Sequence, residues 1–162
     1  MAHWKRNVKK HFMARAIALS IDNVRSGGGG PFGAVIVRNG RIIAEAANCV
    51  TLINDPTAHA EVTAIRKACR KLHKFELKDC EIYTSCEPCP MCVGAIYWAR
   101  LRRVYYAGTA SDAAKAGFDD QFIYREIARK PDRRKISMVR LMHKDALAGF
   151  RAWKESGEKV LY

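Results

Sequence analysis

The chain has 162 residues, of which 49% are hydrophobic, and a formal net charge of +13. This length and composition predict one folded domain, residues 1–162, with a single buried core. No run of eighteen apolar residues appears, and the first residues lack the apolar centre of a signal peptide. We therefore expect no membrane association and a cytoplasmic location.

The cysteines and the basic residues are unevenly distributed. Five of the six cysteines lie between residues 69 and 92. They are too close together for disulfides to cross-link the periphery of a domain, so we expect reduced thiols. Positive charge is concentrated at the amino terminus, along the middle of the chain and at residues 125–135, whereas residues 27–65 carry almost none. A solvated basic surface is the default interpretation, and a nucleic-acid partner stays an alternative.

The first third of the chain predicts a helix, an irregular loop and a hairpin. Apolar residues recur at helical spacing over residues 8–25. Four glycines and a proline follow at residues 27–31. They do not form a phosphate-binding P-loop, because its Lys-Ser/Thr ending and its helix are absent, but close approach of the backbone to a ligand stays open. Residues 32–38 and 41–46 then predict a hairpin with an Asn39-Gly40 turn, the first strand being buried.

The remaining elements alternate between helices and strands. Helices are predicted at residues 60–72, from the Pro-Cys segment to about residue 100, at 121–129 and at 144–156, and strands at 77–85, 103–108 and 136–142. This alternation predicts an α/β fold, a three-layer α/β/α sandwich with right-handed crossovers. In such folds, sites form at the strand ends where helices begin.

Two short motifs lie at such helix starts. His59-Ala60-Glu61 and Pro88-Cys89-Pro90-Met91-Cys92 together match the His-x-Glu…Pro-Cys-x-x-Cys signature of zinc-dependent nucleobase deaminases. A helix start also favours thiolates, which bind metals. Because residues two apart on a regular helix point about 200° apart, His59 and Glu61 face one metal only if His59 lies at an irregular helix entry.

Three protein ligands would leave one position of a tetrahedral zinc ion open, as catalytic sites require. Glu61 is then placed to act as general base and acid, and burial should raise its pKa. An iron–sulfur cluster that includes Cys86 is disfavoured, because the fourth cysteine before a proline is missing. A closed structural zinc site, with Cys80 or Cys86 as fourth ligand, stays an alternative.

Two polar loop residues allow two interpretations each. Asn48 follows a predicted strand and is either a turn residue or a side chain that contacts the edge of a substrate. Asp120 precedes a predicted helix, where it either caps the helix or serves as a second proton-handling carboxylate.

Beyond these motifs, the chain resembles the bacterial guanine deaminases of the cytidine-deaminase-like superfamily. The similar segments are residues 30–37, 55–66, 83–92 and 116–120. The resemblance implies a five-stranded mixed sheet flanked by helices and hydrolytic deamination of guanine to xanthine, with release of ammonia. It implies one zinc ion per subunit held by His59, Cys89 and Cys92, Glu61 as proton shuttle, and Asp120 as the acid that assists the leaving amino group.

The same resemblance implies substrate contacts and an assembly. Phe32 and Asn48 match purine-contacting positions, and Trp98 and Tyr162 are further candidates for the substrate site. The family forms homodimers in which the C-terminal segment, about residues 143–162, swaps between subunits, so that Tyr162 would close the pocket of the partner.

Three rival functions stay open. A tRNA adenosine deaminase shares the zinc motifs and would suit the charge, but the Gly-Phe-Asp-Asp loop at residues 117–120 and the charge-poor site region argue against it. A deaminase of guanosine or an amino-triazine would keep all the same motifs. A zinc-stabilised nucleic-acid-binding module would need no catalytic glutamate.

Overall fold

The structure is a computed structural model that describes residues 2–162, with side chains from residue 9 onward. The chain divides into two compact units, Met1–Gln121 and Phe122–Tyr162. Each is described by itself. Within the described residues, no helix is both long and apolar enough to cross a membrane.

The first unit is built on a four-stranded mixed sheet. Its strands are β1 (Gly33–Arg38), β2 (Arg41–Ala47), β3 (Cys80–Cys86) and β4 (Arg103–Gly108), in the order β2-β1-β3-β4. Pairing is antiparallel except between β3 and β4. The predicted position of β1 at the sheet centre is confirmed. So is the hairpin turn, in which Asn39 and Gly40 both have positive φ, 49° and 73°.

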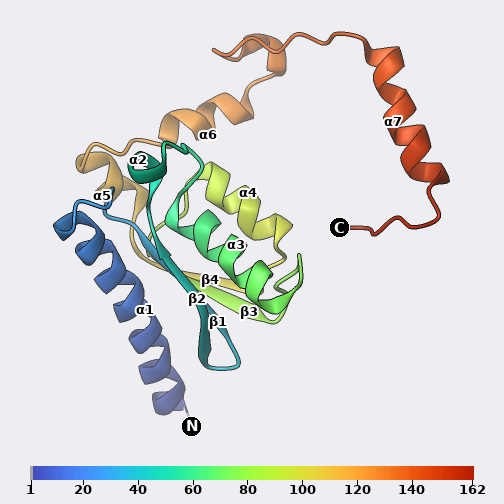
Figure 1. The fold of residues 1–162 in the computed structure, drawn as a ribbon. Coiled ribbons are helices and arrows are strands. Elements are labelled where there is room, and N and C mark those ends of the chain that lie inside the picture. The colour runs from blue at the N-terminus through green and yellow to red at the C-terminus, as the bar shows by residue number, and fades with distance from the viewer. Residues whose placement is uncertain (1) are drawn as a thin grey trace. The chain divides into compact units, whose positions relative to one another are not determined.

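Helices cover both faces of this sheet, as Figure 1 shows. On one face lies α1 (Ala2–Arg25), which begins earlier than the sequence predicts. On the other lie α3 (Ala60–Leu72) and α4 (Pro90–Trp98), and the short helices α2 (Val50–Ile53) and α5 (Ala110–Lys115) occupy connections. The predicted three-layer α/β/α architecture is therefore confirmed.

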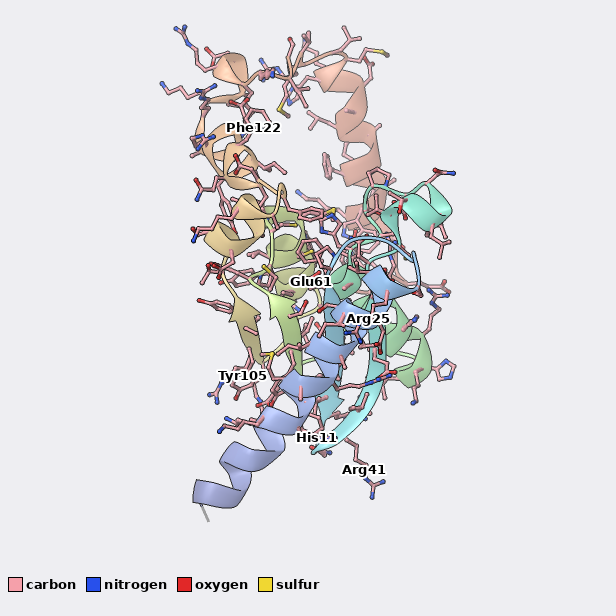
Figure 2. All side chains as sticks on the ribbon, turned by 90° about the vertical axis from the view of Figure 1, so that its left-hand side faces the viewer. His11, Arg25, Arg41, Glu61, Tyr105 and Phe122 are labelled. Carbon is pink, nitrogen blue, oxygen red and sulfur yellow. The ribbon has the colours of Figure 1, made fainter. Side chains whose placement is uncertain are left out.

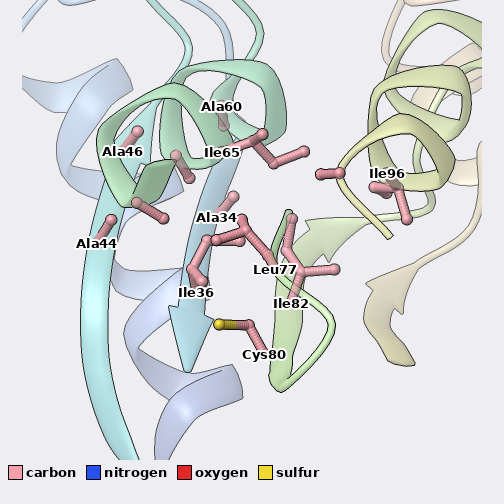
Figure 3. Close-up of a cluster of buried hydrophobic side chains, with 13 residues drawn as sticks. Ala34, Ile36, Ala44, Ala46, Ala60, Ile65, Leu77, Cys80, Ile82 and Ile96 are labelled. Atoms are coloured by element: carbon pink, nitrogen blue, oxygen red, sulfur yellow. The ribbon is translucent and has the colours of Figure 1, made fainter. Parts of the chain in front are cut away.

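Each layer boundary has its own apolar cluster. The cluster between the sheet and α3 and α4 includes Ile36, Leu77 and Ile82, all fully buried (Figure 3). The cluster beneath α1 includes Phe12, Ala16, Val35, Val37 and Tyr83. Because burial of such side chains contributes about 1.5–3 kcal/mol each, the two clusters fix the sheet between its helices.

Gly33 allows α1 to approach the sheet closely. A Cβ atom at this position would lie 2.3 Å from the backbone oxygen of Ala16 and 2.9 Å from the backbone nitrogen of Ser20. Only glycine fits there without moving the helix.

The second unit contains most of α6 (Gln121–Ala128), the 3₁₀ turn η1 (Pro131–Arg133) and α7 (His143–Glu155). Arg134 donates to the carbonyl oxygens of Ile127 and Arg129, at 3.1 and 3.2 Å, and so caps the end of α6.

The prediction of a fifth strand is wrong. The sheet has four strands, and residues 136–142 are irregular and exposed, without a ladder in the described part of the chain. Their apolar, β-branched pattern favours an extended backbone. A strand also needs a neighbour for its N–H and C=O groups, and the described residues of the second unit supply none.

The predicted site lies at one end of the sheet. Figure 2 shows Glu61 toward the end where α1 finishes at Arg25, whereas Arg41 lies at the hairpin at the opposite end. The parallel strands β3 and β4 also finish at the first of these ends, at Cys86 and Gly108. This is where α/β folds form their sites.

Candidate active site

The two zinc motifs place their side chains at the starts of two helices. His59 is the N-cap of α3, with φ −65° and ψ 154°, and Cys89 is the N-cap of α4, with φ −68° and ψ 169°. Both backbones are extended, so the predicted irregular entry at His59 is confirmed. Neither side chain caps its helix, although N-cap side chains commonly do so. The His59 imidazole and the Cys89 thiol can therefore contact each other.

The three proposed ligand atoms form a compact triangle. His59 Nδ1 lies 3.5 Å from Cys89 Sγ and 3.6 Å from Cys92 Sγ, and all three ligand atoms lie within 4.8 Å of one another. A tetrahedral ion bound at about 2.1 Å to nitrogen and about 2.3 Å to sulfur separates the two atoms by roughly 3.6 Å. The residues therefore fit a zinc ion. Among the described residues they form the single such cluster of His, Cys, Asp or Glu.

The electrostatics of the cluster also favour a cation. A hydrogen bond from Cys92, together with one from His59, lowers the pKa of the Cys89 thiol to about 4. The pKa of Cys92 is raised, because its proton bonds to Cys89 and its sulfur is buried near Glu61. The pKa of His59 is raised chiefly by its hydrogen bond with Cys89. A zinc ion would replace these shared protons.

Glu61 lies beside the cluster, on the first turn of α3. Its side chain is 6% exposed, and its Oε2 lies 3.4 Å from Cys92 Sγ. Burial raises the pKa of the carboxyl group, as the sequence predicts for a group that both takes and gives a proton.

Asp120 has a buried oxygen that has no partner among the described residues. Its Oδ1 is inaccessible and makes no hydrogen bond within the described residues, and burial raises the pKa of the carboxyl group. Such an atom in a native fold needs an explanation, and a catalytic function or a bound water or ion are among those that apply. The alternative capping function is carried by its neighbour, since Asp119 Oδ1 accepts from Gln121 N at 3.0 Å.

Asn48 and Phe32 lie on adjoining segments. Asn48 is 7% exposed, and its N–H donates to the carbonyl oxygen of Phe32 at 3.0 Å. The Phe32 ring meets Phe118 edge to face, with centroids 5.0 Å apart. This contact brings the start of β1 to the loop that carries Asp120.

The remaining two substrate candidates are exposed side chains. Trp98 is the last residue of α4 and 68% exposed. Tyr162 belongs to the second unit and is 71% exposed. Of the alternative fourth ligands, Cys80 is buried in the core beside α3, and Cys86 Sγ donates to Thr109 O at 3.5 Å. Neither belongs to the ligand cluster, so a closed four-ligand site is disfavoured.

Sequence reasoning missed the residues that fix the loops around the site. Ser85 Oγ accepts from Gly33 N at 2.9 Å, which ties the end of β3, from which the Cys89 loop leaves, to the start of β1. Glu87 Oε2 accepts from Ala110 N at 2.9 Å. Asn23, at the end of α1, bonds to the glycine loop and to Asn48. The run of glycines indicated a close approach of the backbone at this place, but not that Asn23 makes it.

Comparison with known proteins agrees with this geometry. Residues 6–108 match the cytidine and deoxycytidylate deaminase zinc-binding region. The chain is 56% identical to guanine deaminase of Bacillus subtilis over 151 residues, which cover 93% of this chain and 97% of that protein. It is 44% identical to the tRNA-specific adenosine deaminase of Agrobacterium fabrum over 101 residues, 60% of this chain and 64% of that one.

Solved structures give the same result. The crystal structure of Bacillus subtilis guanine deaminase superimposes with a TM-score of 0.92 at 55% identity, covering 94% of this chain and 98% of that one. A guanine deaminase from Nitrosomonas europaea superimposes with a TM-score of 0.64 at 29% identity, covering 87% and 81%. The chain therefore belongs to the cytidine and deoxycytidylate deaminase family of zinc-dependent enzymes.

Proposed function

We propose that the protein is a zinc-dependent guanine deaminase, which converts guanine and water to xanthine and ammonia. The observation that carries the proposal is the extent of the similarity. Likeness to the Bacillus subtilis guanine deaminase covers 93% of the chain, whereas likeness to the Agrobacterium tRNA-specific enzyme covers 60%. A match over 60% of the chain is what we expect when two proteins share only a zinc-binding core.

His59, Cys89 and Cys92 would hold the zinc, which when bound acts as a Lewis acid and lowers the pKa of a coordinated water toward about 7. Glu61, 3.4 Å from a ligand sulfur, takes the proton of the attacking water and delivers it to a ring nitrogen of guanine. The water oxygen bonds to C2 as that carbon rehybridises. The C2–N bond then breaks as the new C2–O bond becomes a carbonyl, and Asp120 assists by passing the proton of the C2 hydroxyl to the departing amino group, which leaves as ammonia.

Purine recognition falls to residues around this centre. Asn48 offers a buried amide at the strand end, and the Phe32 ring, supported by Phe118, offers an apolar surface for a flat heterocycle. Buried polar groups that hydrogen-bond to the edge of a substrate discriminate strongly against its analogues, because an analogue without the matching group leaves them unpaired.

For the assembly, we propose a cytoplasmic homodimer in which residues 143–162 cross to the partner and Tyr162 closes its site. Support comes from the second unit, where Leu141, Phe150 and Leu161 are exposed. Large apolar side chains that stay exposed mark interaction surfaces.

The swap is tested by complementation. A Glu61→Gln chain with an intact C-terminus and a Tyr162→Ala chain with an intact Glu61 should each be weakly active, and mixed dimers should recover a fraction of wild-type activity. The matched control carries both substitutions in one chain, mixed with wild type. Absence of recovery in dimers shown to be mixed would reject the swap.

The substrate is tested by parallel assays of the candidate substrates. Purified zinc-loaded protein is given guanine in one reaction and tRNA containing adenosine at the wobble position in another, with guanosine and an amino-triazine as further arms. We expect xanthine and ammonia in equal amounts, and faster guanine turnover than inosine formation in tRNA. Faster inosine formation would instead support a tRNA adenosine deaminase, whose polyanionic substrate the net charge of +13 would suit.

A further inference from the structure

Asn23, near the end of α1, joins three segments around the site. Its Nδ2 donates to the carbonyl oxygen of Gly30 at 2.9 Å and to that of Asn48 at 2.8 Å. Carbonyl oxygens only accept, so both protons of this amide are used. One side chain therefore fastens the helix end, the glycine loop and the segment after β2 to one another.

The segment held by Asn23 is the one that adjoins the ligands. Asn48 N donates to Phe32 O at 3.0 Å, and its own Oδ1 accepts from Val50 N at 3.2 Å. The next residue, Cys49, donates its N–H to Ala58 O at 3.0 Å. Ala58 directly precedes His59 in the chain. Movement of this segment would displace the Asn48 amide relative to the zinc cluster.

The glycine loop leaves room for the hydrogen bonds of Asn23, because its residues have no side chains. A Cβ at Gly28 would lie 2.4 Å from Asn23 Oδ1, and a Cβ at Gly29 would lie 3.0 Å from Asn48 O. Gly29 also has a φ of +139°, which L side chains rarely adopt. The zinc chemistry makes no use of this glycine run. Its closeness to Asn23 and Asn48 gives it a structural purpose.

We propose that Asn23 is a positioning residue for purine recognition, acting through the backbone of Asn48 and accommodated by Gly28. The proposal rests on the proposed function in one respect, the assignment of a purine contact to Asn48. Asn23 itself touches no substrate and moves no proton, so its loss should weaken guanine binding more than it slows the chemical step.

The first test replaces the amide donors. Asn23→Ala should raise the KM for guanine roughly 3- to 30-fold, the size expected for two lost hydrogen bonds, with a much smaller change in kcat. Asn23→Asp keeps the shape but turns an acceptor toward two carbonyl oxygens, so its KM should rise further. If the Asn23 side chain only filled space, Asn23→Asp would be milder than Asn23→Ala. The control is Ser26→Ala, which removes a bond from Ser26 Oγ to Asn23 O at the same helix end and should leave KM unchanged.

The second test uses Gly28. Gly28→Ala should raise KM, because the new methyl group displaces the Asn23 amide. In an Asn23→Ala background the same substitution should have almost no effect, since the obstructing oxygen is gone. Equal effects of Gly28→Ala in both backgrounds would overturn the proposal.

A readout without substrate separates this inference from the proposed function. Hydrogen exchange at the amides of Asn48, Cys49 and Val50 should accelerate in Asn23→Ala and not in Ser26→Ala, because all three amides of the held segment donate hydrogen bonds, to Phe32, Ala58 and the Asn48 side chain respectively. A wild-type protein that fails to deaminate guanine would reject the proposed function, and the exchange result would still decide the contact. Unchanged exchange, or a fall in kcat with KM constant, would overturn the inference.

Discussion

Gly33→Ala should destabilise the protein more than any other single methyl group added to its glycines. The added Cβ would lie 2.3 Å from Ala16 O, 2.8 Å from Leu19 Cβ and 2.9 Å from Ser20 N, whereas ordinary contact begins at 3.4 Å. Two of these atoms belong to the backbone of α1, which cannot turn aside as a side chain can. Relief therefore requires α1 to move away from β1 by about 1 Å, a displacement that loosens the dense packing at this boundary.

The magnitude follows from the cost of overpacking. Additions to a packed core cost about 1–3 kcal/mol, and a clash with helix backbone belongs at the upper end of that range. At roughly 2–4 °C per kcal/mol for a chain of this size, Tm should fall by about 6–12 °C. Differential scanning calorimetry of the zinc-loaded protein measures this directly. Guanine KM should rise as well, because Asn23 lies on the displaced end of α1.

Gly94→Ala is the matched control. Gly94 lies inside α4, and a Cβ there would meet no atom within 4 Å. Alanine is the better helix former by about 0.5–1 kcal/mol, so this variant should melt at or slightly above the wild-type Tm. If Gly33→Ala also melts within 2 °C of wild type, the close approach of α1 to β1 is incorrect.

Three further outcomes are expected. Cys92→Ala should remove one of three ligands, so elemental analysis should find well under one zinc per chain, and retention of a full zinc would contradict the assigned ligand set. Leu77→Ala, at a position 0% exposed, should cost about 2–5 kcal/mol in urea unfolding, and a loss below 1 kcal/mol would place Leu77 outside the core. Stability should fall above pH 9, because burial raises the pKa of Cys80 to about 11 and the neutral thiol favours the fold. The contribution of the neutral Cys80 thiol to the free energy of unfolding, on the order of 2–3 kcal/mol, is complete below pH 9 and lost by pH 11. Cys80→Ala should therefore flatten the pH dependence of the unfolding free energy in this range. An unchanged slope would refute Cys80 as the cause.

Local patterns predicted most of the fold. The Asn-Gly pair specified the hairpin turn because both residues tolerate positive φ, and the two-residue spacing of His59 and Glu61 required the extended entry that puts His59 beside the thiols. The zinc ligands were predictable because the metal dictates the residue types and their spacing.

What the sequence did not reveal depends on long-range contacts. Residues 136–142 have the composition of a strand but no partner in their unit, and strand formation depends on the partner. The sequence left Asp120 between a helix cap and a proton-handling carboxylate, and it did not indicate that Asp119 makes the hydrogen bond at the helix start. Asn23 is 25 residues from Asn48, so nothing local pairs them.

The most direct measurement of the central claim is xanthine formation from guanine by the zinc-loaded wild type, beside Glu61→Gln at equal zinc content. Glutamine keeps the shape of Glu61 but cannot take a proton from water, so kcat should fall by at least about 10²- to 10⁴-fold while one zinc per chain is retained. Wild-type activity should vanish with a chelator and return with zinc. Turnover of the zinc-loaded variant at the wild-type rate would contradict the account.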